Sequence, residues 1–254
     1  MNIVEIRHIT LGEGRPKTCT SIVGTTRESI YAECIKLKSL PVDIIEWRVD
    51  WYEAGKDVKA ILEILKEIRT LIAERSLLFT IRTSEEGGEN NYTAEEYESI
   101  ISQVFVYSDV DAIDVEIYKT GINAKELIQR IQAENIVVIA SNHDFSKTPP
   151  KEEMVRRLQE MQTLGADVLK LAVMPQNTSD VITLLDATRE MSECYATQPL
   201  VTMSMSSLGT ISRLSGETFG SCMSFGSGES VSAPGQIQVS ELAHILDVLH
   251  TNNE

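Results

Sequence analysis

The chain has 254 residues, of which 42% are hydrophobic and 24% charged, a composition typical of globular proteins rather than of disordered or fibrous ones. Its formal net charge of −15 argues against nucleic acid and against an anionic membrane surface as partners. No apolar run approaches the roughly 20 residues that cross a bilayer, so we expect neither a membrane span nor a membrane partner.

The N-terminus and the cysteines both favour the cytoplasm. The first 16 residues lack the basic and then apolar layout of a signal peptide. Cys19, Cys34, Cys194 and Cys222 show no CxxC spacing and lie in or beside apolar segments, so we expect reduced thiols in the core. These features predict a cytoplasmic protein.

Short apolar runs alternate with amphipathic segments along the chain. The predicted strands cover 18–24, 43–50, 77–83, 111–117, 136–142, 167–173, 200–205 and 221–226. Predicted helices include 58–74, 123–134, 152–165 and the C-terminal 238–250, and Thr93 and Ser179 are expected to cap two more at their N-termini. Eight strand–helix units without a linker predict an α/β fold, a (β/α)₈ TIM barrel that forms a single domain over 1–254.

A doubly wound sheet is the alternative architecture for alternating strands and helices. Its glycine-rich first turn, GxGxxG, is absent, because the first predicted strand leads into "VGTTRES". The segment "NIVEIRHITLGEGRPK" (2–17) falls outside the eight units. We expect it to form a short β-hairpin that closes the bottom of the barrel.

Lys170 lies in the middle of the buried strand 167–173, where an unpaired ammonium group costs several kcal/mol. Because alternate residues of a strand share a face, the same face carries Val168 and Ala172, which leave space around the amine. The corresponding face of the other strands carries Glu46, Arg48, Thr80, Arg82, Asp114, Glu116, Ser141, His143, Met203, Met205, Met223 and Phe225, with Asp50 just beyond. Most of the polar ones lie toward the carboxyl ends of their strands, where barrel enzymes have their active sites.

Metal and phosphate sites are two alternatives at this face. Asp50, Asp114, Glu116 and His143 are possible metal ligands, but the neighbouring arginines and lysine, and the lack of HxH or HExxH spacing, argue against a metal. The segment "GSGESVSAPGQ" (226–236) is compatible with a phosphate-binding loop, yet its length and composition favour a lid that closes over a ligand.

An imine site explains the buried lysine better. A lysine that is desolvated and near other cations has a lowered pKa, so that it can attack a ketone or aldehyde as a neutral amine. His143, on the preceding strand, is suited to move protons because the ordinary pKa of histidine is near neutrality. Aldol cleavage and elimination of a β-hydroxyl both fit these residues, which by themselves do not choose between the two reactions.

Several longer motifs occur in order along the whole chain: "EWRVD" (46–50), "TIRTSEEGGE" (80–89), "DVEI" (114–117), "VIASNHD" (138–144), "VLKLAVMP" (168–175), "MSMSSLGTISR" (203–213) and "SAPGQ" (232–236). With these motifs the chain closely resembles the type I 3-dehydroquinate dehydratases, the Schiff-base enzymes of the shikimate pathway. The resemblance implies that the substrate is 3-dehydroquinate and that the products are 3-dehydroshikimate and water.

The resemblance also implies a role for each motif residue. Lys170 forms the imine, His143 removes the adjacent proton and helps to expel the hydroxyl, and Glu86 orients the histidine. The implied substrate-binding residues are Arg213 for the carboxylate, Ser232 and Gln236 from the lid, the polar residues Glu46, Arg48, Arg82 and Ser21, and the apolar residues Met203, Met205 and Phe225. No metal and no organic cofactor is implied, and the expected assembly is a homodimer.

Two alternative functions remain at this point. A class I aldolase or transaldolase shares the fold and the lysine, but acts on a phosphorylated sugar. A barrel that only binds a polyhydroxylated carboxylate would need the cations and the lid, but not a buried amine beside a histidine.

Overall fold

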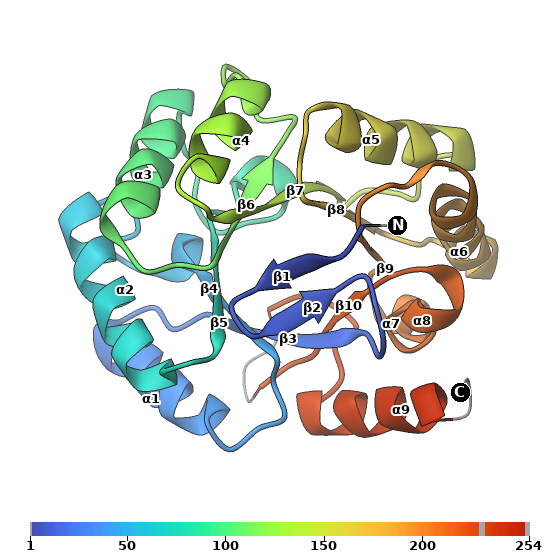
Figure 1. Ribbon diagram of the computed structural model, residues 1–254, viewed down its shortest axis with the longest axis horizontal. Coiled ribbons are helices and arrows are strands. Elements are labelled where there is room, and N and C mark those ends of the chain that lie inside the picture. The colour runs from blue at the N-terminus through green and yellow to red at the C-terminus, as the bar shows by residue number, and fades with distance from the viewer. Residues whose placement is uncertain (1, 229–231, 252–254) are drawn as a thin grey trace.

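The structure, a computed structural model, describes residues 2–228 and 232–251. Eight parallel strands form one sheet in the order β10-β3-β4-β5-β6-β7-β8-β9, and helices surround it (Figure 1). The strands are β3 (Lys17–Ile22), β4 (Ile44–Arg48), β5 (Ser76–Thr80), β6 (Ala112–Glu116), β7 (Val137–Asp144), β8 (Val168–Val173), β9 (Leu200–Ser204) and β10 (Met223–Phe225). A single parallel bridge between Leu200 and Ser221 joins β9 to the segment before β10 and closes the ring. The predicted (β/α)₈ barrel is confirmed.

The helices follow from apolar periodicity and from capping residues. Their bounds are α1 (Arg27–Leu37), α2 (Val58–Ile72), α3 (Ala94–Tyr107), α4 (Ala124–Gln132), α5 (Lys151–Thr163), α6 (Thr178–Glu190), α7 (Thr210–Leu214), α8 (Gly216–Phe219) and α9 (Val239–Thr251). Thr93 caps α3 as predicted, in a capping box with Glu96. The predicted start at Ser179 is wrong, because the Asn177 side chain accepts a hydrogen bond from the Asp180 N–H and starts α6 earlier.

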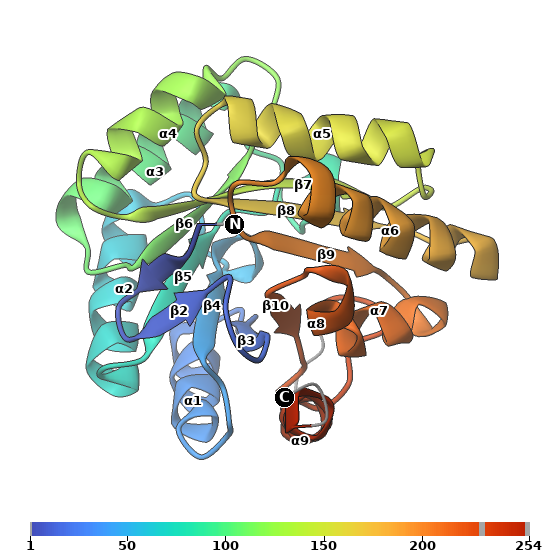
Figure 2. The same cartoon turned by 45° about the vertical axis from the view of Figure 1, so that its right-hand side comes forward.

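The hairpin closes the bottom of the barrel, as predicted. Strands β1 (Val4–Ile6) and β2 (Ile9–Leu11) pair antiparallel and lie over the near end of the barrel in Figures 1 and 2. Ile6 and Leu11 are fully buried and pack into the barrel interior with Ile44 and Leu78. Ser76 Oγ, at the start of β5, donates to the carbonyl oxygen of Ile6 at 2.8 Å. The amino ends of the strands are therefore covered, and the carboxyl ends are left for a ligand.

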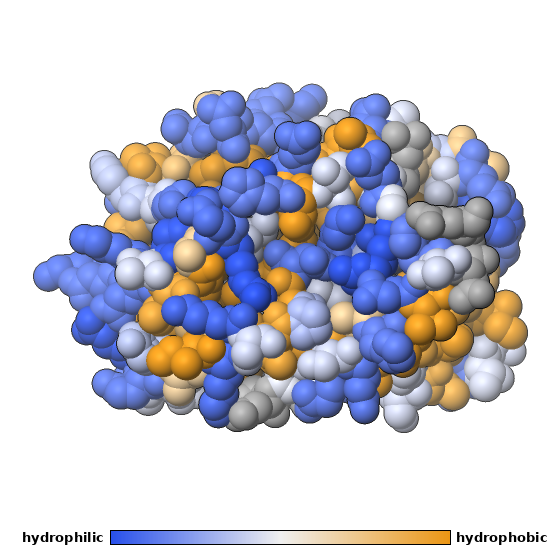
Figure 3. Space-filling model, turned by 60° about the horizontal axis from the view of Figure 1, so that its bottom comes forward, coloured by the Kyte–Doolittle hydropathy of each residue, from blue (hydrophilic) through white to orange (hydrophobic). Residues whose placement is uncertain are grey.

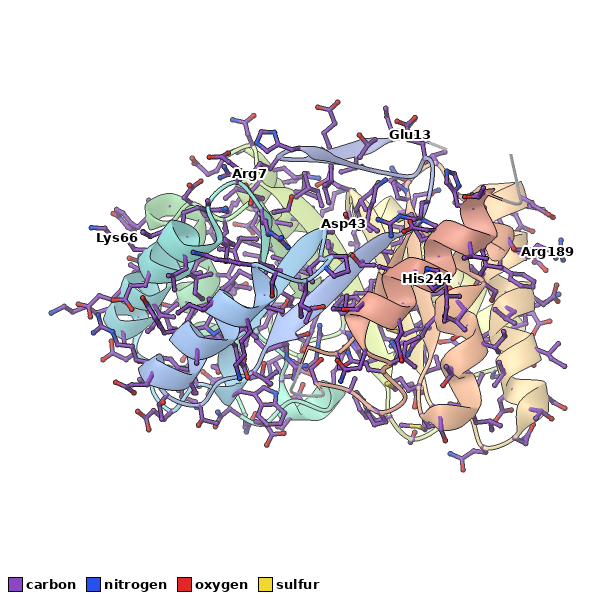
Figure 4. All side chains as sticks on the ribbon, turned by 90° about the horizontal axis from the view of Figure 1, so that it is seen from below. Arg7, Glu13, Asp43, Lys66, Arg189 and His244 are labelled. Carbon is purple, nitrogen blue, oxygen red and sulfur yellow. The ribbon has the colours of Figure 1, made fainter. Side chains whose placement is uncertain are left out.

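Ion pairs fasten the rim of the hairpin. The Arg7 guanidinium contacts Asp111 at 2.8 Å and Asp109 at 3.1 Å. Figure 4 shows the hairpin, with Arg7 and Glu13 labelled, at the end of the barrel that is drawn uppermost. The hairpin is thus held by an apolar contact inside the barrel and by charges around it.

The structure confirms that the cysteines are free but changes the expected position of one of them. All four cysteines are free, and Cys19 and Cys34 are buried, but the expected core position of Cys194 is wrong. Cys194 is exposed because it lies in the π-helical turn η3 (Met191–Tyr195), of which only Met191 packs inward.

The face drawn in Figure 3 is mostly hydrophilic, with apolar side chains in separate patches. None of the helices in residues 2–228 and 232–251 is long and apolar enough to cross a membrane.

Candidate active site

The inward-facing side chains surround a cavity at the carboxyl ends of the strands. Of the residues predicted for the site, the structure places around this cavity Ser21, Glu46, Arg48, Arg82, His143, Lys170, Met203, Met205, Arg213, Phe225, Ser232 and Gln236. Glu86 does not line the cavity; its carboxylate contacts Nδ1 of His143. Alternation along each strand brings these residues together, because one face of every strand points into the barrel.

Lys170 projects from β8 and is almost completely buried. Its Nζ donates to Asp114 Oδ2 at 2.9 Å, lies 3.9 Å from Glu46 Oε1 and sits 4.8 Å from the centre of the Phe225 ring. Two carboxylates and an aromatic ring thus lie beside Nζ, and the cations expected near the lysine, Arg48 and Arg82, line the same cavity. The carboxylates fix the amine at one point of the cavity wall.

Asp114 is a fixed anion beneath the lysine. Besides Lys170, it accepts hydrogen bonds from Arg82 Nη2 at 2.8 Å and from Ser141 Oγ at 2.6 Å. Although burial disfavours the charged form, Arg82 and Lys170 together lower the pKa of Asp114 to about 2. The carboxylate therefore stays ionised at neutral pH and organises the cations around it.

His143, on β7, forms a pair with Glu86. Glu86 Oε2 lies 2.9 Å from His143 Nδ1 and accepts the backbone N–H of His143 at 2.9 Å, and Asn142 Nδ2 donates to Oε1 at 2.9 Å. Burial, followed by the charges of Arg82, Lys170 and Arg48, lowers the pKa of His143 well below its ordinary value. Glu86 thus fixes the ring, and Nε2 is the nitrogen left for a ligand.

The segment that carries Glu86 is a tight 3₁₀ turn, η2 (Ser84–Glu86). At Gly88 a Cβ would lie 1.9 Å from the Arg82 carbonyl oxygen, so only glycine fits this approach of the backbone. Asp50 holds both ends of the turn by accepting the backbone N–H groups of Arg82 and Glu89, each at 3.2 Å.

The three arginines of the cavity differ in their partners. Arg48 forms two hydrogen bonds of 2.8 Å to Asp50, and Arg82 is paired with Asp114 and Glu116. Arg213 is also buried, yet no carboxylate pairs with it among the residues that the structure describes.

The contacts of Arg213 are weak ones. Its guanidinium reaches the carbonyl oxygens of Phe225 at 3.4 Å and Pro234 at 3.2 Å, and within the described residues its buried Nε has no acceptor. Burial lowers the pKa of Arg213 to about 10, which leaves it cationic at neutral pH. A buried cation for which the described residues supply no counter-ion, at the wall of a cavity, is suited to bind an anionic group of a ligand.

Part of the predicted lid closes one side of the cavity. Ser232 Oγ donates to Ser21 Oγ at 3.0 Å, and Gln236 Nε2 donates to Ser232 Oγ at 3.0 Å. The Pro234 carbonyl oxygen accepts the Ser206 N–H at 3.1 Å as well as Arg213 Nη2. Residues 229–231 of the predicted lid lie outside the described residues, and its movement stays a prediction.

Besides Ala172, which alternation along its strand places on the inward face, two cavity residues do not appear in the predicted set. Phe145 and Ala233 also line the cavity. Phe145 continues the alternation of Ser141 and His143 by one step, so the parity of β7 contains the signal that would have found it. Within residues 2–228 and 232–251, no three His, Cys, Asp or Glu side chains are grouped to hold a metal ion.

Comparison with known proteins identifies the family. The family model for type I 3-dehydroquinase matches residues 18–253. The chain belongs to the type I 3-dehydroquinase family. The chain is similar to curated relatives over nearly its full length. The 3-dehydroquinate dehydratase of Bacillus subtilis is 44% identical to it over 99% of both chains. The 3-dehydroquinate dehydratase of Clostridioides difficile is 48% identical over 97% of both chains.

A solved structure extends the similarity to three dimensions. The type I 3-dehydroquinate dehydratase from Clostridium difficile, with covalently modified comenic acid, superimposes with a TM-score of 0.95 at 46% identity and covers 99% of this chain and 98% of its own. As a type I 3-dehydroquinase, the chain is a hydro-lyase, so elimination of water, and not aldol cleavage, is its reaction.

Proposed function

We propose that the chain dehydrates 3-dehydroquinate to 3-dehydroshikimate, in the shikimate pathway, through an imine between the substrate ketone and Lys170. The observation that supports the imine most directly is that the almost fully buried Lys170 and the partly buried His143 line the same cavity. A site that only bound its ligand would have no use for a buried amine beside an imidazole.

The proposed reaction begins at Lys170 Nζ. Glu46 Oε1, 3.9 Å away, is placed to take the proton that the ammonium must lose before it attacks the ketone carbon. The carbonyl oxygen then leaves as water, and a cationic iminium forms. Because the iminium withdraws electrons, it makes the hydrogen on the neighbouring carbon acidic.

His143 carries out the elimination. Its Nε2 removes the proton next to the iminium carbon, and the electron pair of that C–H bond moves into an enamine. The nitrogen lone pair then re-forms the iminium, and the enamine π pair becomes the new carbon–carbon double bond as the C–O bond to the β-hydroxyl breaks. The leaving hydroxyl takes the proton from His143 and departs as water. A second water hydrolyses the iminium, so that one water is lost in total and Lys170 is regenerated.

The remaining cavity residues hold the substrate. Arg213, a buried cation that pairs with no carboxylate in residues 2–228 and 232–251, binds the substrate carboxylate together with Ser232 and Gln236. The polar walls that face the ring hydroxyls are Ser21, Glu46, Arg48 and Arg82, and the apolar walls are Met203, Met205 and Phe225. No metal or organic cofactor takes part in the proposed reaction.

The test is the intact mass after incubation with 3-dehydroquinate and borohydride. Wild type should gain the mass of the reduced adduct, Lys170→Ala should gain none, and His143→Ala should gain it slowly. Lys119→Ala is the matched control, because Lys119 is buried and ion-paired with Glu85 but does not line the cavity; it should still trap. An adduct on Lys170→Ala, or near-normal turnover by that variant, contradicts the imine.

We also propose that the chain is a single domain and works as a homodimer in the cytoplasm. The family resemblance supports the dimer, one sheet that runs through all eight barrel strands supports the single domain, and the free cysteines support a reducing compartment. Sedimentation velocity tests the dimer. The cooperativity of urea unfolding tests the single domain, and cell fractionation tests the cytoplasmic location.

A further inference from the structure

Arg82 lies among three buried carboxylates that compete for its guanidinium. Nη2 is 2.8 Å from Asp114 Oδ1, while Nη1 is 2.7 Å from Glu116 Oε1 and 3.6 Å from Glu86 Oε2. Glu116 and Glu86 therefore face the same nitrogen, and Glu116 holds the shorter contact. Because Glu116 takes the short contact with Nη1, Glu86 is left with only the longer contact to Arg82.

Glu116 is fixed in this position from several sides. Its Oε1 also accepts the Thr83 N–H at 2.9 Å, and its Oε2 accepts the Thr83 hydroxyl at 2.7 Å. Its own backbone N–H donates to the hydroxyl of Tyr97 at 3.0 Å. With a side chain only 1% exposed, Glu116 can neither turn to solvent nor release Arg82 without leaving Thr83 unpaired.

Glu86 is consequently left with neutral donors and with His143. Burial first, and then the charge of Glu116, raise the pKa of Glu86 to about 8, whereas Arg82 and Asn142 oppose the rise and Asp114 adds to it. On the same turn, Glu85 is paired with Lys119. The other charged groups that face the Glu86–His143 pair are Lys170 on β8 and Arg48 on β4, and both disfavour an imidazolium.

We propose that Glu116 is a positioning residue for the dehydration: it holds Nη1 of Arg82 away from Glu86 and so reserves the Glu86 carboxyl for His143. The inference rests on the proposed role of His143 as the base. Glu116 touches neither that ring nor the cavity, and it acts through Arg82 and Glu86.

The direction of the effect follows from the proton that the pair shares. His143 Nε2 can accept the substrate proton only after the Glu86–His143 pair has lost its own. Without the charge of Glu116, Arg82 turns to Glu86 and stabilises the ionised carboxyl, so the pair loses that proton at a lower pH. The acidic limb of the kcat profile then moves to lower pH, and the plateau falls because the imidazole becomes a weaker base.

The experiment compares Glu116→Gln with Asp50→Asn. Both variants neutralise a buried carboxylate that anchors the same turn, but Asp50 pairs with Arg48 and with backbone amides. Glu116→Gln should move the acidic limb down by about one pH unit. Asp50→Asn should reduce kcat without moving the limb. A limb that stays in place in Glu116→Gln, or that moves equally in both variants, overturns the proposal.

A double variant and a measurement on wild type complete the test. In a Glu86→Gln background, Glu116→Gln should cause no additional shift of the limb, and an additive shift would show that Glu116 does not act through Glu86. The infrared carboxyl band that is present in wild type and absent in Glu86→Gln should titrate well above the ordinary pKa of a glutamate, about 4.3. Titration of the Glu86 band at the ordinary value overturns the proposal whether or not Lys170 forms an imine. Because the measurement uses wild type, it does not depend on whether the Glu116 variant folds.

Discussion

The two ends of the barrel interior are built from the same strands but from opposite kinds of residue. At the amino ends, the interior is an apolar core of Cys19, Ile44, Leu78, Ala112, Ile139 and Val168, covered by Ile6 and Leu11 from the hairpin. Two residues further along the same face, β4, β6 and β8 present Glu46, Asp114 and Lys170. Each strand thus contributes to stability at one end and to chemistry at the other.

The difference shows how a charged interior can be tolerated. Buried ion pairs such as Lys170–Asp114 and Arg82–Glu116 gain little net stability, because the cost of desolvation offsets their attraction. The apolar end has no such cost and is sealed by the hairpin. We therefore expect substitutions at the carboxyl end to change activity and substitutions at the amino end to change stability.

The largest effect is expected at His143. His143→Ala should reduce kcat by more than about 10⁴-fold, because one side chain moves the proton at the carbon and at the leaving hydroxyl. Thermal unfolding should change little, since the imidazole lies at the end of β7 and contributes nothing to the apolar core. A loss of stability that accounts for the loss of activity would remove the distinction between the two ends.

At the amino end, Leu11→Ala should lower the free energy of unfolding by about 2–5 kcal/mol, because Leu11 is fully buried against the barrel interior. The kcat of the folded fraction should stay near that of wild type. Urea unfolding measures the first quantity and steady-state kinetics the second. Ile3→Ala, at a side chain that is 52% exposed, is the control and should change neither.

Arg213 offers an intermediate effect at the carboxyl end. Arg213→Ala should raise KM by about 10²-fold, the value of a charge-assisted hydrogen-bonded pair, with a smaller change in kcat. Arg213→Lys should restore only part of the affinity. Because burial lowers the pKa of Arg213 to about 10, binding should be strong below that pH and weaken above it. An unchanged KM in the alanine variant would exclude Arg213 from the carboxylate site.

The smallest effect is expected at the rim of the hairpin. Arg7→Gln removes ion pairs to Glu74 and Asp109, which are largely exposed, and one to the more buried Asp111. Partly exposed pairs of this kind contribute about 1 kcal/mol or less. Urea unfolding of Arg7→Gln and of Leu11→Ala compares the contributions of charge and of apolar packing to holding the hairpin. An equal loss of unfolding free energy in the two variants would contradict the prediction that apolar packing contributes more.

Most of the fold and the membership of the site could be predicted from the sequence. The eight strands, the cap at Thr93, the hairpin and the inward face of each strand all depend on spacings of a few residues, which a single chain displays directly. Lys170 stood out because one charge in an apolar strand breaks a local pattern. Local periodicity determines which face a side chain occupies, and this was enough to collect most of the cavity residues on and beside the strands, whereas Arg213, Ser232 and Gln236 are expected only from the family resemblance.

The pairing of charges was decided only by the tertiary structure. Asp114 is 56 residues from Lys170, and nothing in the spacing says that Asp114, rather than Glu116, contacts Nζ. Nor does the spacing say that Arg213 pairs with none of the carboxylates that the structure describes. The exposure of Cys194 and the division of the segment after β9 into the short helices α7 and α8 were likewise unpredictable. Such contacts depend on how far side chains from different strands reach into a shared space, and that distance exists only once the barrel has closed.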